Sequence, residues 1–227
     1  GLTSRADELI AEATEVSRTI DHINDLSNLN LKLYSWYIQN GHARNQNDMK
    51  TVQALMDHEL VKNAGASFYE KVYLYQCSVW YAYIKLDFLM YYRYCQKWVD
   101  IFEQYPKMIE TETAMYVKGM HNLMSAHFNL LNHEKLASSI RKFKRFAQTE
   151  LVQDNDNNRI VTYVYLYTAV INLHFLEGAF HKGIKMVPFL EEMLVKYGRY
   201  LDRHRVMVFY YKIACLYFGS GDNSNAI

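Results

Sequence analysis

Residues that break helices are scarce in this chain, which has only 2 prolines and 9 glycines among its 227 residues. An all-β chain of this length would need many more turn residues, because tight turns are built from glycine, proline and asparagine. Hydrophobic residues make up 50% and charged residues 22%, a balance that excludes a disordered chain and supplies a substantial core. The scarcity of breakers therefore predicts long helices and an all-α fold.

Apolar residues recur at helical spacing along almost the whole chain. The first such series steps by four and three residues, and it consists of Leu9, Ala13, Val16, Ile20 and Ile23. The same periodicity predicts ten helices and the start of an eleventh near Ala226. Their approximate ranges are 4–27, 28–40, 46–62, 67–88, 89–105, 108–131, 133–149, 158–177, 179–197 and 200–218.

Several of the predicted boundaries have recognisable signals. Asn40 and Gly41 are expected to stop a helix, and a turn is expected over 63–66. Ser67 with Glu70 three residues later is a capping box, which predicts a helix start. Pro106 is expected to end a helix, whereas Pro188 falls inside 179–197 and is expected to kink it.

No motif of known chemistry stands out. The three cysteines are isolated from one another, so they predict neither a disulfide framework nor a zinc site. His58-Glu59 and His133-Glu134 begin like a metalloprotease motif but lack its second histidine. Phosphate-binding glycine loops and a nucleophile elbow are missing from the sequence. We therefore predict no catalytic residue, no metal and no cofactor, and keep a helical enzyme with scattered catalytic residues as the third hypothesis.

The charge pattern gives no global attraction to nucleic acid or membrane, because the net charge is +1. A basic stretch at Arg141, Lys142, Lys144 and Arg145 is typical of a solvated helix face. Its alternative interpretation is a site for an acidic partner or for nucleic acid, and the near-neutral net charge argues against nucleic acid. The longest uncharged run, Ile160–Leu176, is short for a membrane span and contains polar residues. Since a signal-peptide pattern is also lacking, we predict a cytoplasmic protein without nucleic-acid or membrane partners.

The end of the chain resembles a tetratricopeptide repeat. A small residue, Ala214, is followed by an aromatic residue at Tyr217, by a turn at Gly221-Asp222 and by a second small residue at Ala226. Small residues at such positions let the two helices of a hairpin cross closely, and the aromatic side chain fills the gap to the next repeat. The resemblance implies a right-handed superhelix of antiparallel helix hairpins, about four and a half of them.

The same template fits upstream more loosely. Its equivalent markers lie 42, 47 and 43 residues apart, at Tyr94, Leu136, Gly183 and Ala226. The usual repeat has 34 residues, so these repeats would be stretched and degenerate. We predict an N-terminal cap or repeat remnant over 1–27 and tetratricopeptide-like repeats over 28–227, the last one incomplete. An irregular helical bundle is the alternative.

The resemblance also implies a site, because the first helices of such repeats line the concave side of the superhelix. Counting from the markers gives eight positions expected to be exposed there: Tyr83, Lys118, His121, Ser125, Tyr165, Thr168, Asn172 and Tyr211. Core packing between repeats is the alternative for the tyrosines. The family's carboxylate-binding positions correspond to Val79, Tyr83, Asn122, Tyr165 and Ala169, and only the asparagine matches. We therefore do not predict binding of chaperone C-termini.

The first functional hypothesis is a non-catalytic scaffold that binds a protein or peptide in this concave groove. The second is a regulatory module of a larger chain, such as a transcription regulator, that senses a small ligand or peptide. Exposed tyrosines would also allow a homo-oligomer. For either hypothesis, we expect the double substitution of His121 and Asn172 by Ala to weaken binding while leaving thermal stability almost unchanged.

Overall fold

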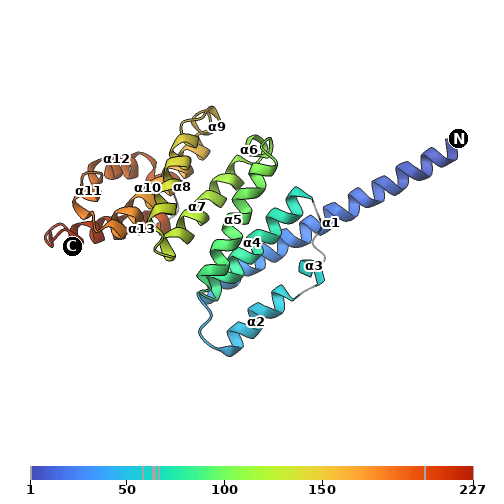
Figure 1. The fold of residues 1–227 in the computed structure, drawn as a ribbon, viewed down its shortest axis with the longest axis horizontal. Coiled ribbons are helices and arrows are strands. Elements are labelled where there is room, and N and C mark those ends of the chain that lie inside the picture. The colour runs from blue at the N-terminus through green and yellow to red at the C-terminus, as the bar shows by residue number, and fades with distance from the viewer. Residues whose placement is uncertain (1, 58, 63–64, 66, 202, 227) are drawn as a thin grey trace. The chain divides into compact units, whose positions relative to one another are not determined.

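The computed structural model describes residues 2–57, 59–62, 65, 67–201 and 203–226, and within these ranges every regular element is helical. The all-α prediction is therefore confirmed. The helices, labelled in Figure 1, are α1 (Leu2–Asn40), α2 (Gln46–Met56), α3 (Glu59–Lys62), α4 (Phe68–Ile84), α5 (Phe88–Gln104), α6 (Met108–Thr111), α7 (Thr113–Asn129), α8 (His133–Phe146), α9 (Glu150–Gln153), α10 (Asp156–Glu177), α11 (Phe180–Ile184), α12 (Val187–Tyr197), a 3₁₀ turn (Gly198–Tyr200) and α13 (Arg203–Gly219).

The chain divides into two compact units, Gly1–Met108 and Ile109–Ile227, which we call the N-terminal unit and the C-terminal unit. The boundary predicted after residue 27 lies inside α1, which runs without interruption from Leu2 to Asn40. Two helices were expected here, and this expectation is wrong. Between Ile23 and Asn28 the chain has no glycine or proline, so nothing interrupts the backbone hydrogen bonds.

The N-terminal unit is built around α4, which packs against both α1 and α5. Its core contains Leu33, Val52, Cys77 and Ile84, and these side chains are fully buried. Ser67 and Glu70 form the predicted capping box at the start of α4. The turn predicted over 63–66 lies almost entirely outside the described residues.

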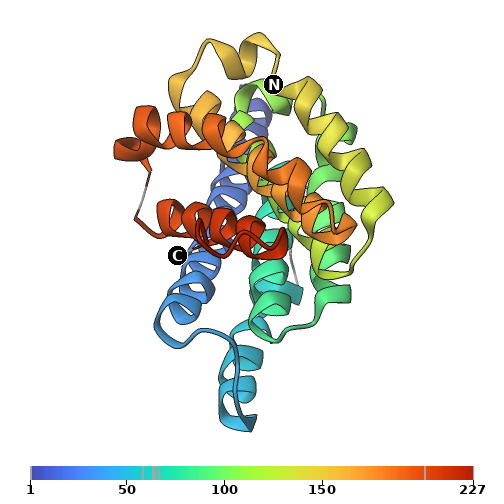
Figure 2. The same cartoon turned by 90° about the vertical axis from the view of Figure 1, so that its left-hand side faces the viewer.

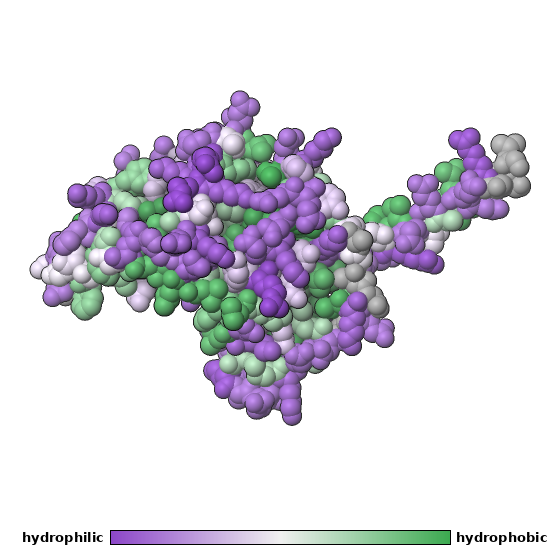
Figure 3. All heavy atoms as spheres, viewed as in Figure 1, coloured by the Kyte–Doolittle hydropathy of each residue, from purple (hydrophilic) through white to green (hydrophobic). Residues whose placement is uncertain are grey.

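The C-terminal half of α1 supplies the packing of that helix, whereas residues 5–18 are all exposed. Figure 1 shows this N-terminal half extending beyond α4, its main packing partner. Its exposed side chains include several large apolar ones, among them Leu9, Ile10 and Val16, each more than half accessible. In the space-filling view, green apolar surface alternates with purple polar surface along this extended part of the chain (Figure 3).

The C-terminal unit is built around α10, which contacts α7, α8, α9, α11 and α13. Figure 2 shows this unit from a second direction. Its fully buried side chains include Met120 of α7, Phe143 of α8, Ile171 of α10 and Leu216 of α13. Because α10 is enclosed by so many neighbours, residues on its inner faces are held in fixed positions.

Two helices predicted in this unit are divided in the structure. The predicted 179–197 helix is two helices, because Pro188 lies in the first turn of α12 and begins that helix instead of kinking it. The predicted 108–131 helix is divided at Glu112, where α6 ends and α7 starts. Beyond α13, residues 220–226 form turns, so the helix start expected near Ala226 is not present there.

Candidate functional site

The strongest concentration of interacting polar side chains in the C-terminal unit joins α7, α10 and α13. The imidazole of His121 on α7 stacks on the ring of Tyr165 on α10, with centroids 3.9 Å apart and planes at 15°. Nη2 of Arg205 on α13 donates to the hydroxyl of Tyr165 at 3.2 Å. The guanidinium carbon also lies 5.3 Å from the centre of the same ring, within cation–π distance. One tyrosine thus holds side chains from the two flanking helices.

A second connection of the same kind lies two helical turns along. Nζ of Lys212 on α13 donates a hydrogen bond to Oδ1 of Asn172 on α10. The ammonium group also lies 5.4 Å from the ring centre of Phe175 and 5.8 Å from that of Phe128 on α7. Lys212 is therefore fixed by a buried amide and by two aromatic faces.

The electrostatics of these side chains are dominated by positive charge. Desolvation lowers the pKa of His121 to about 3, and the charges of Arg205, Lys118 and Lys212 add to the effect. Desolvation and the charge of Arg205 also hold the pKa of Lys118 below its usual value. Burial lowers the pKa of Lys212. In the described part of the chain, neither Lys118 nor Lys212 forms an ion pair with a carboxylate.

We call this group the basic–aromatic cluster. It consists of Lys118, His121, Tyr165, Asn172, Arg205 and Lys212. Its solvent-facing member is Lys118, which is exposed, whereas His121, Arg205 and Lys212 are half-buried. The local sequence explains why it is ordered: α10 begins at a capping asparagine, Asn155, and ends at Gly178, whose φ of +62° closes the helix.

The eight predicted positions are not all brought together. Lys118, His121, Tyr165 and Asn172 belong to the cluster, and Ser125 and Thr168 lie one turn away on the same helices. The Thr168 hydroxyl donates to the carbonyl of Val164 in its own helix. Exposure was wrongly expected for Tyr165 and Asn172, which are 9% and 6% accessible. Both sit on the central helix α10, where α7 and α13 cover them from either side.

Sequence reasoning does not identify Arg205 and Lys212, which the structure adds to the cluster through their contacts. They lie 40 residues after Tyr165 and Asn172, their respective hydrogen-bond partners. The same shift of 40 residues therefore leads from each of these two positions on α10 to its cation on α13. The last two markers are 43 residues apart, three more than this shift, so counting from the markers gives Tyr211 on α13 instead.

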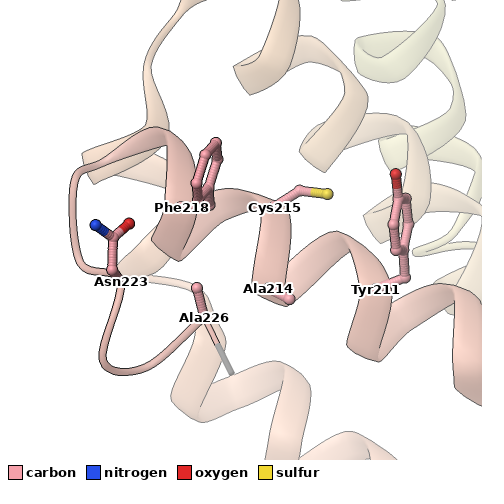
Figure 4. Close-up of a pocket in the computed structure, with 6 residues that line it drawn as sticks. All are labelled: Tyr211, Ala214, Cys215, Phe218, Asn223 and Ala226. Atoms are coloured by element: carbon pink, nitrogen blue, oxygen red, sulfur yellow. The ribbon is translucent and has the colours of Figure 1, made fainter.

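Tyr211 occupies a different face of α13, and it is 71% accessible. Together with Ala214, Cys215 and Phe218 it lines a shallow apolar pocket of about 340 Å³, completed by Asn223 and Ala226. Figure 4 shows these side chains along one side of the helix and the turn that follows it. The pocket offers almost no polar groups for orienting a ligand.

Tyr83 belongs to the N-terminal unit, where it lies in an aromatic cluster of its own. Its ring is 5.3 Å from Tyr37, 5.0 Å from His42 and 5.4 Å from Tyr91. Burial raises its pKa to about 12, with a smaller contribution from Tyr37. His42 also hydrogen-bonds through Nδ1 to the Tyr83 carbonyl at 2.9 Å. These contacts join α1, α4 and the loop after α1, which indicates a packing role.

A histidine, a carboxylate and a serine also meet in the N-terminal unit. Nδ1 of His22 lies 2.6 Å from Oε1 of Glu70, and the Ser67 hydroxyl donates to Oε2 at 2.6 Å. The serine hydroxyl thus contacts the carboxylate rather than the imidazole, so these three side chains do not form the serine–histidine contact of an activated nucleophile. Nε2 of His22 reaches the Leu60 carbonyl at 3.2 Å. The arrangement connects α1, α3 and α4 and caps the last.

Among the described residues, no group of three His, Cys, Asp or Glu side chains is placed to hold a metal ion. Of the near-motifs, His58 lies outside the described residues, and His133 hydrogen-bonds to Glu177 at 2.9 Å. Within the same residues, α10 is the one helix whose length and composition would allow it to cross a membrane. It packs on several neighbours and carries the buried polar residues Thr162 and Asn172.

Comparison with known proteins gives no match to a family model, to a curated protein or to a solved structure. The function is therefore proposed from the side chains themselves.

Proposed function

We propose that this protein is a non-catalytic scaffold that binds a protein or peptide segment on the face that carries the basic–aromatic cluster. One observation carries the proposal: three helices well separated in sequence direct aromatic and cationic side chains into one connected group. Tyrosine and arginine are enriched in the energetically important parts of protein interfaces. A rigid platform of this kind also lowers the entropy lost on binding.

We further propose that the helices follow a tetratricopeptide-like right-handed superhelix, with α7, α10 and α13 as first helices. The 40-residue shift that relates Tyr165 to Arg205 and Asn172 to Lys212 supports this arrangement. In such an arrangement the cluster lies on the concave side.

A site-specific photocrosslinker tests the proposal in cells that express the full chain. One variant carries it at Ser125, beside the cluster, and a matched variant carries it at the exposed Ser138 of α8. We expect a discrete crosslinked protein from position 125 that is lost when Lys118 is also replaced by Glu. The same products from both positions, or none that depends on Lys118, would overturn the proposal. A small molecule that co-purifies and blocks crosslinking at 125 would instead favour the regulatory hypothesis.

A further inference from the structure

Two separate faces run along α1. One carries the buried side chains of Leu26, Leu29 and Leu33, through which the helix packs on its own unit. The other lies about a third of a turn around the helix, and we call it the outer α1 face. It consists of Leu9, Ala13, Val16, Ile20, Ser27, Leu31, Tyr34 and Ile38. Its six large apolar side chains are each 44–63% accessible, and a row of this kind marks an interaction surface.

The outer α1 face is straight, and its spacing is the same from both ends. From Leu9 to Ile38 its members are separated by 4, 3, 4, 7, 4, 3 and 4 positions. These steps average about 3.6 residues per turn, so the face does not wind around a straight helix. The series is symmetrical about a point between Ile23 and Asn24. Two antiparallel copies therefore place each member opposite another member, which is the self-complementarity of a twofold interface.

The side chains that meet in such a pair are also complementary in size. Antiparallel pairing opposes each member from the first half of the face to one from the second half: Leu9 to Ile38, Ala13 to Tyr34, Val16 to Leu31, and Ile20 to Ser27. Small Ala13 thus lies opposite the largest side chain, Tyr34, and small Ser27 lies opposite Ile20. The Tyr34 ring is already held 5.1 Å from the ring of Trp80 on α4. Alternation of large and small residues lets two facing surfaces interdigitate.

The charges of α1 favour the antiparallel direction. Residues 5–25 carry six carboxylates and two arginines, whereas residues 26–44 carry no carboxylate and two cations, Lys32 and Arg44. Parallel pairing would lay the acidic half of one helix along the acidic half of the other, where like charges repel. Antiparallel pairing lays it along the half that has the cations. The two copies are therefore complementary in charge as well as in shape.

An antiparallel pair also gives the extended half of α1 the packing that it lacks. Residues 5–18 are all exposed, and a helix in water gains most of its stability by packing an apolar face. In the pair, this half lies along the C-terminal half of the second α1, which Leu29 and Leu33 anchor in its own core. The contact is about 44 Å long and about 10 Å wide on each copy, roughly 900 Å² in total. Specific interfaces at the small end of the range have this size and are weak.

We propose that the outer α1 face binds a second copy of this chain and forms an antiparallel dimer, with its twofold axis between Ile23 and Asn24. The inference is independent of the proposed function, because α1 belongs to the N-terminal unit and the basic–aromatic cluster to the C-terminal unit.

Sedimentation of the full chain from about 1 to about 500 μM measures the association, for which we expect a Kd of about 10 μM. Four variants each place one charge on the outer α1 face: Leu9→Lys, Val16→Lys, Leu31→Glu and Ile38→Glu. All four positions are more than half exposed, so the monomer should keep its fold, and urea unfolding below the Kd checks this. Each variant alone should associate at least about thirtyfold more weakly, because the charge meets an apolar side chain twice in the dimer.

Mixtures of the variants test the antiparallel register. Leu9→Lys with Ile38→Glu, and Val16→Lys with Leu31→Glu, are matched mixtures that place a cation opposite a carboxylate. They should associate with a Kd within about fivefold of the wild-type value. Leu9→Lys with Leu31→Glu, and Val16→Lys with Ile38→Glu, are mismatched mixtures with the same charges. They should remain at least about tenfold weaker than the wild-type protein.

Three results would overturn the inference. A wild-type chain that is monomeric at about 500 μM would exclude the dimer. Self-association that none of the four variants weakens would place the contact on another surface. Equal association of matched and mismatched mixtures would mean general charge attraction or a different register. The two matched mixtures are independent of each other, so a variant that failed to fold would leave the other mixture to decide.

Discussion

The imidazole of His121 lies almost flat on the ring of Tyr165, and their centroids are 3.9 Å apart. This contact joins α7 to α10, while the Tyr165 hydroxyl accepts a hydrogen bond from Arg205 on α13. Tyr165 therefore has two separable functions, a stacking surface and a hydrogen-bond acceptor. The hydroxyl can be removed while the ring stays, and a second variant can remove both.

Tyr165→Phe keeps the ring and removes the hydroxyl. We expect it to lower the free energy of unfolding by about 1 kcal/mol, the usual net value of one hydrogen bond. Tyr165→Ala should cost about 3 kcal/mol or more, because it also removes a buried ring. Urea unfolding measures both. Tyr211→Phe is the control, since Tyr211 is 71% accessible. Equal losses of unfolding free energy in the Phe and Ala variants would mean that the ring adds nothing beyond the hydroxyl.

The ring of His121 should titrate near pH 3, well below the ordinary histidine pKa of 6.5. Because the folded pKa is the lower one, the unfolded chain binds the proton first, and stability falls as pH drops below about 6.5. Lys118→Met should raise the His121 pKa, since it removes one neighbouring charge. The pKa should remain below 6.5, because desolvation is the larger cause. NMR titration measures it, with Lys144→Met as control. A titration midpoint near 6.5 in the wild-type protein would show that the His121 ring is neither desolvated nor close to these cations.

Glu70 should contribute to stability above its unfolded pKa of about 4.5 and lose that contribution at lower pH. Burial alone would raise its pKa, but hydrogen bonds from Ser67 and His22 outweigh burial and lower it. The folded protein therefore holds the carboxylate form more strongly than the unfolded chain does, and acid removes the benefit. Glu70→Gln should cost about 2 kcal/mol at pH 7.

The loss in Glu70→Gln should shrink as the pH falls from 4.5 through the folded pKa, because protonation weakens the wild-type contacts as well. Thermal unfolding from pH 7 to pH 3 measures this convergence. Glu12→Gln, at an exposed position of α1, is the matched control and should be nearly neutral. A loss in Glu70→Gln that stayed constant over the whole pH range would mean that its charge is irrelevant.

Gly183 is needed for the close approach of α11 to α13. A Cβ atom there would lie 2.4 Å from Cδ2 of Leu216, which is fully buried. Gly183→Ala should therefore destabilise by about 1–3 kcal/mol, despite the better helix propensity of alanine. Gly198→Ala is the matched control: nothing lies within 4 Å of its Cβ position, and its φ is −57°. It should stabilise by up to about 1 kcal/mol. If Gly183→Ala and Gly198→Ala lowered the free energy of unfolding by similar amounts in urea, the close packing of Gly183 on Leu216 would be contradicted.

Local signals made much of the fold predictable. The capping box of Ser67 and Glu70 is present as expected, and Gly41 ends α1 with a φ of +74°. Such signals act within a few residues, so they can be recognised in the sequence. The predicted helix boundaries were wrong where no glycine or proline marks the turn, or where an unusual residue forms it. Leu86, with a φ of +58°, turns the chain between α4 and α5, and a leucine gives no warning of such a turn.

The candidate site could be predicted only in part, for a related reason. Lys118, His121 and Asn172 were predicted by counting from the markers of the repeat resemblance, and the structure places them on α7 and α10 in the cluster. The register of α13 depends on how its apolar residues pack, and a repeat of variable length does not determine it. Arg205 and Lys212 therefore became visible only through their contacts with Tyr165 and Asn172.

The N-terminal half of α1 should be dispensable for the fold. The side chains of residues 5–18 are all exposed, so a chain shortened to begin at residue 19 loses little buried apolar surface from them. We expect the shortened chain to unfold at nearly the same urea concentration, within about 0.5 kcal/mol of the full chain.

The same deletion should reduce self-association, because Leu9, Val16 and Ile20 form an apolar stripe with the spacing of a coiled-coil seam and are each more than half exposed. Sedimentation over a range of concentrations measures it. The double substitution Leu9→Ser and Val16→Ser in the full chain is the control, since it removes two of the three apolar residues of the stripe and keeps the length. A large loss of stability on deletion would show that these residues pack against the protein. Self-association that survives both changes would place the contact elsewhere, and the exposed Tyr211 and Phe218 of α13 would be the next surface to test.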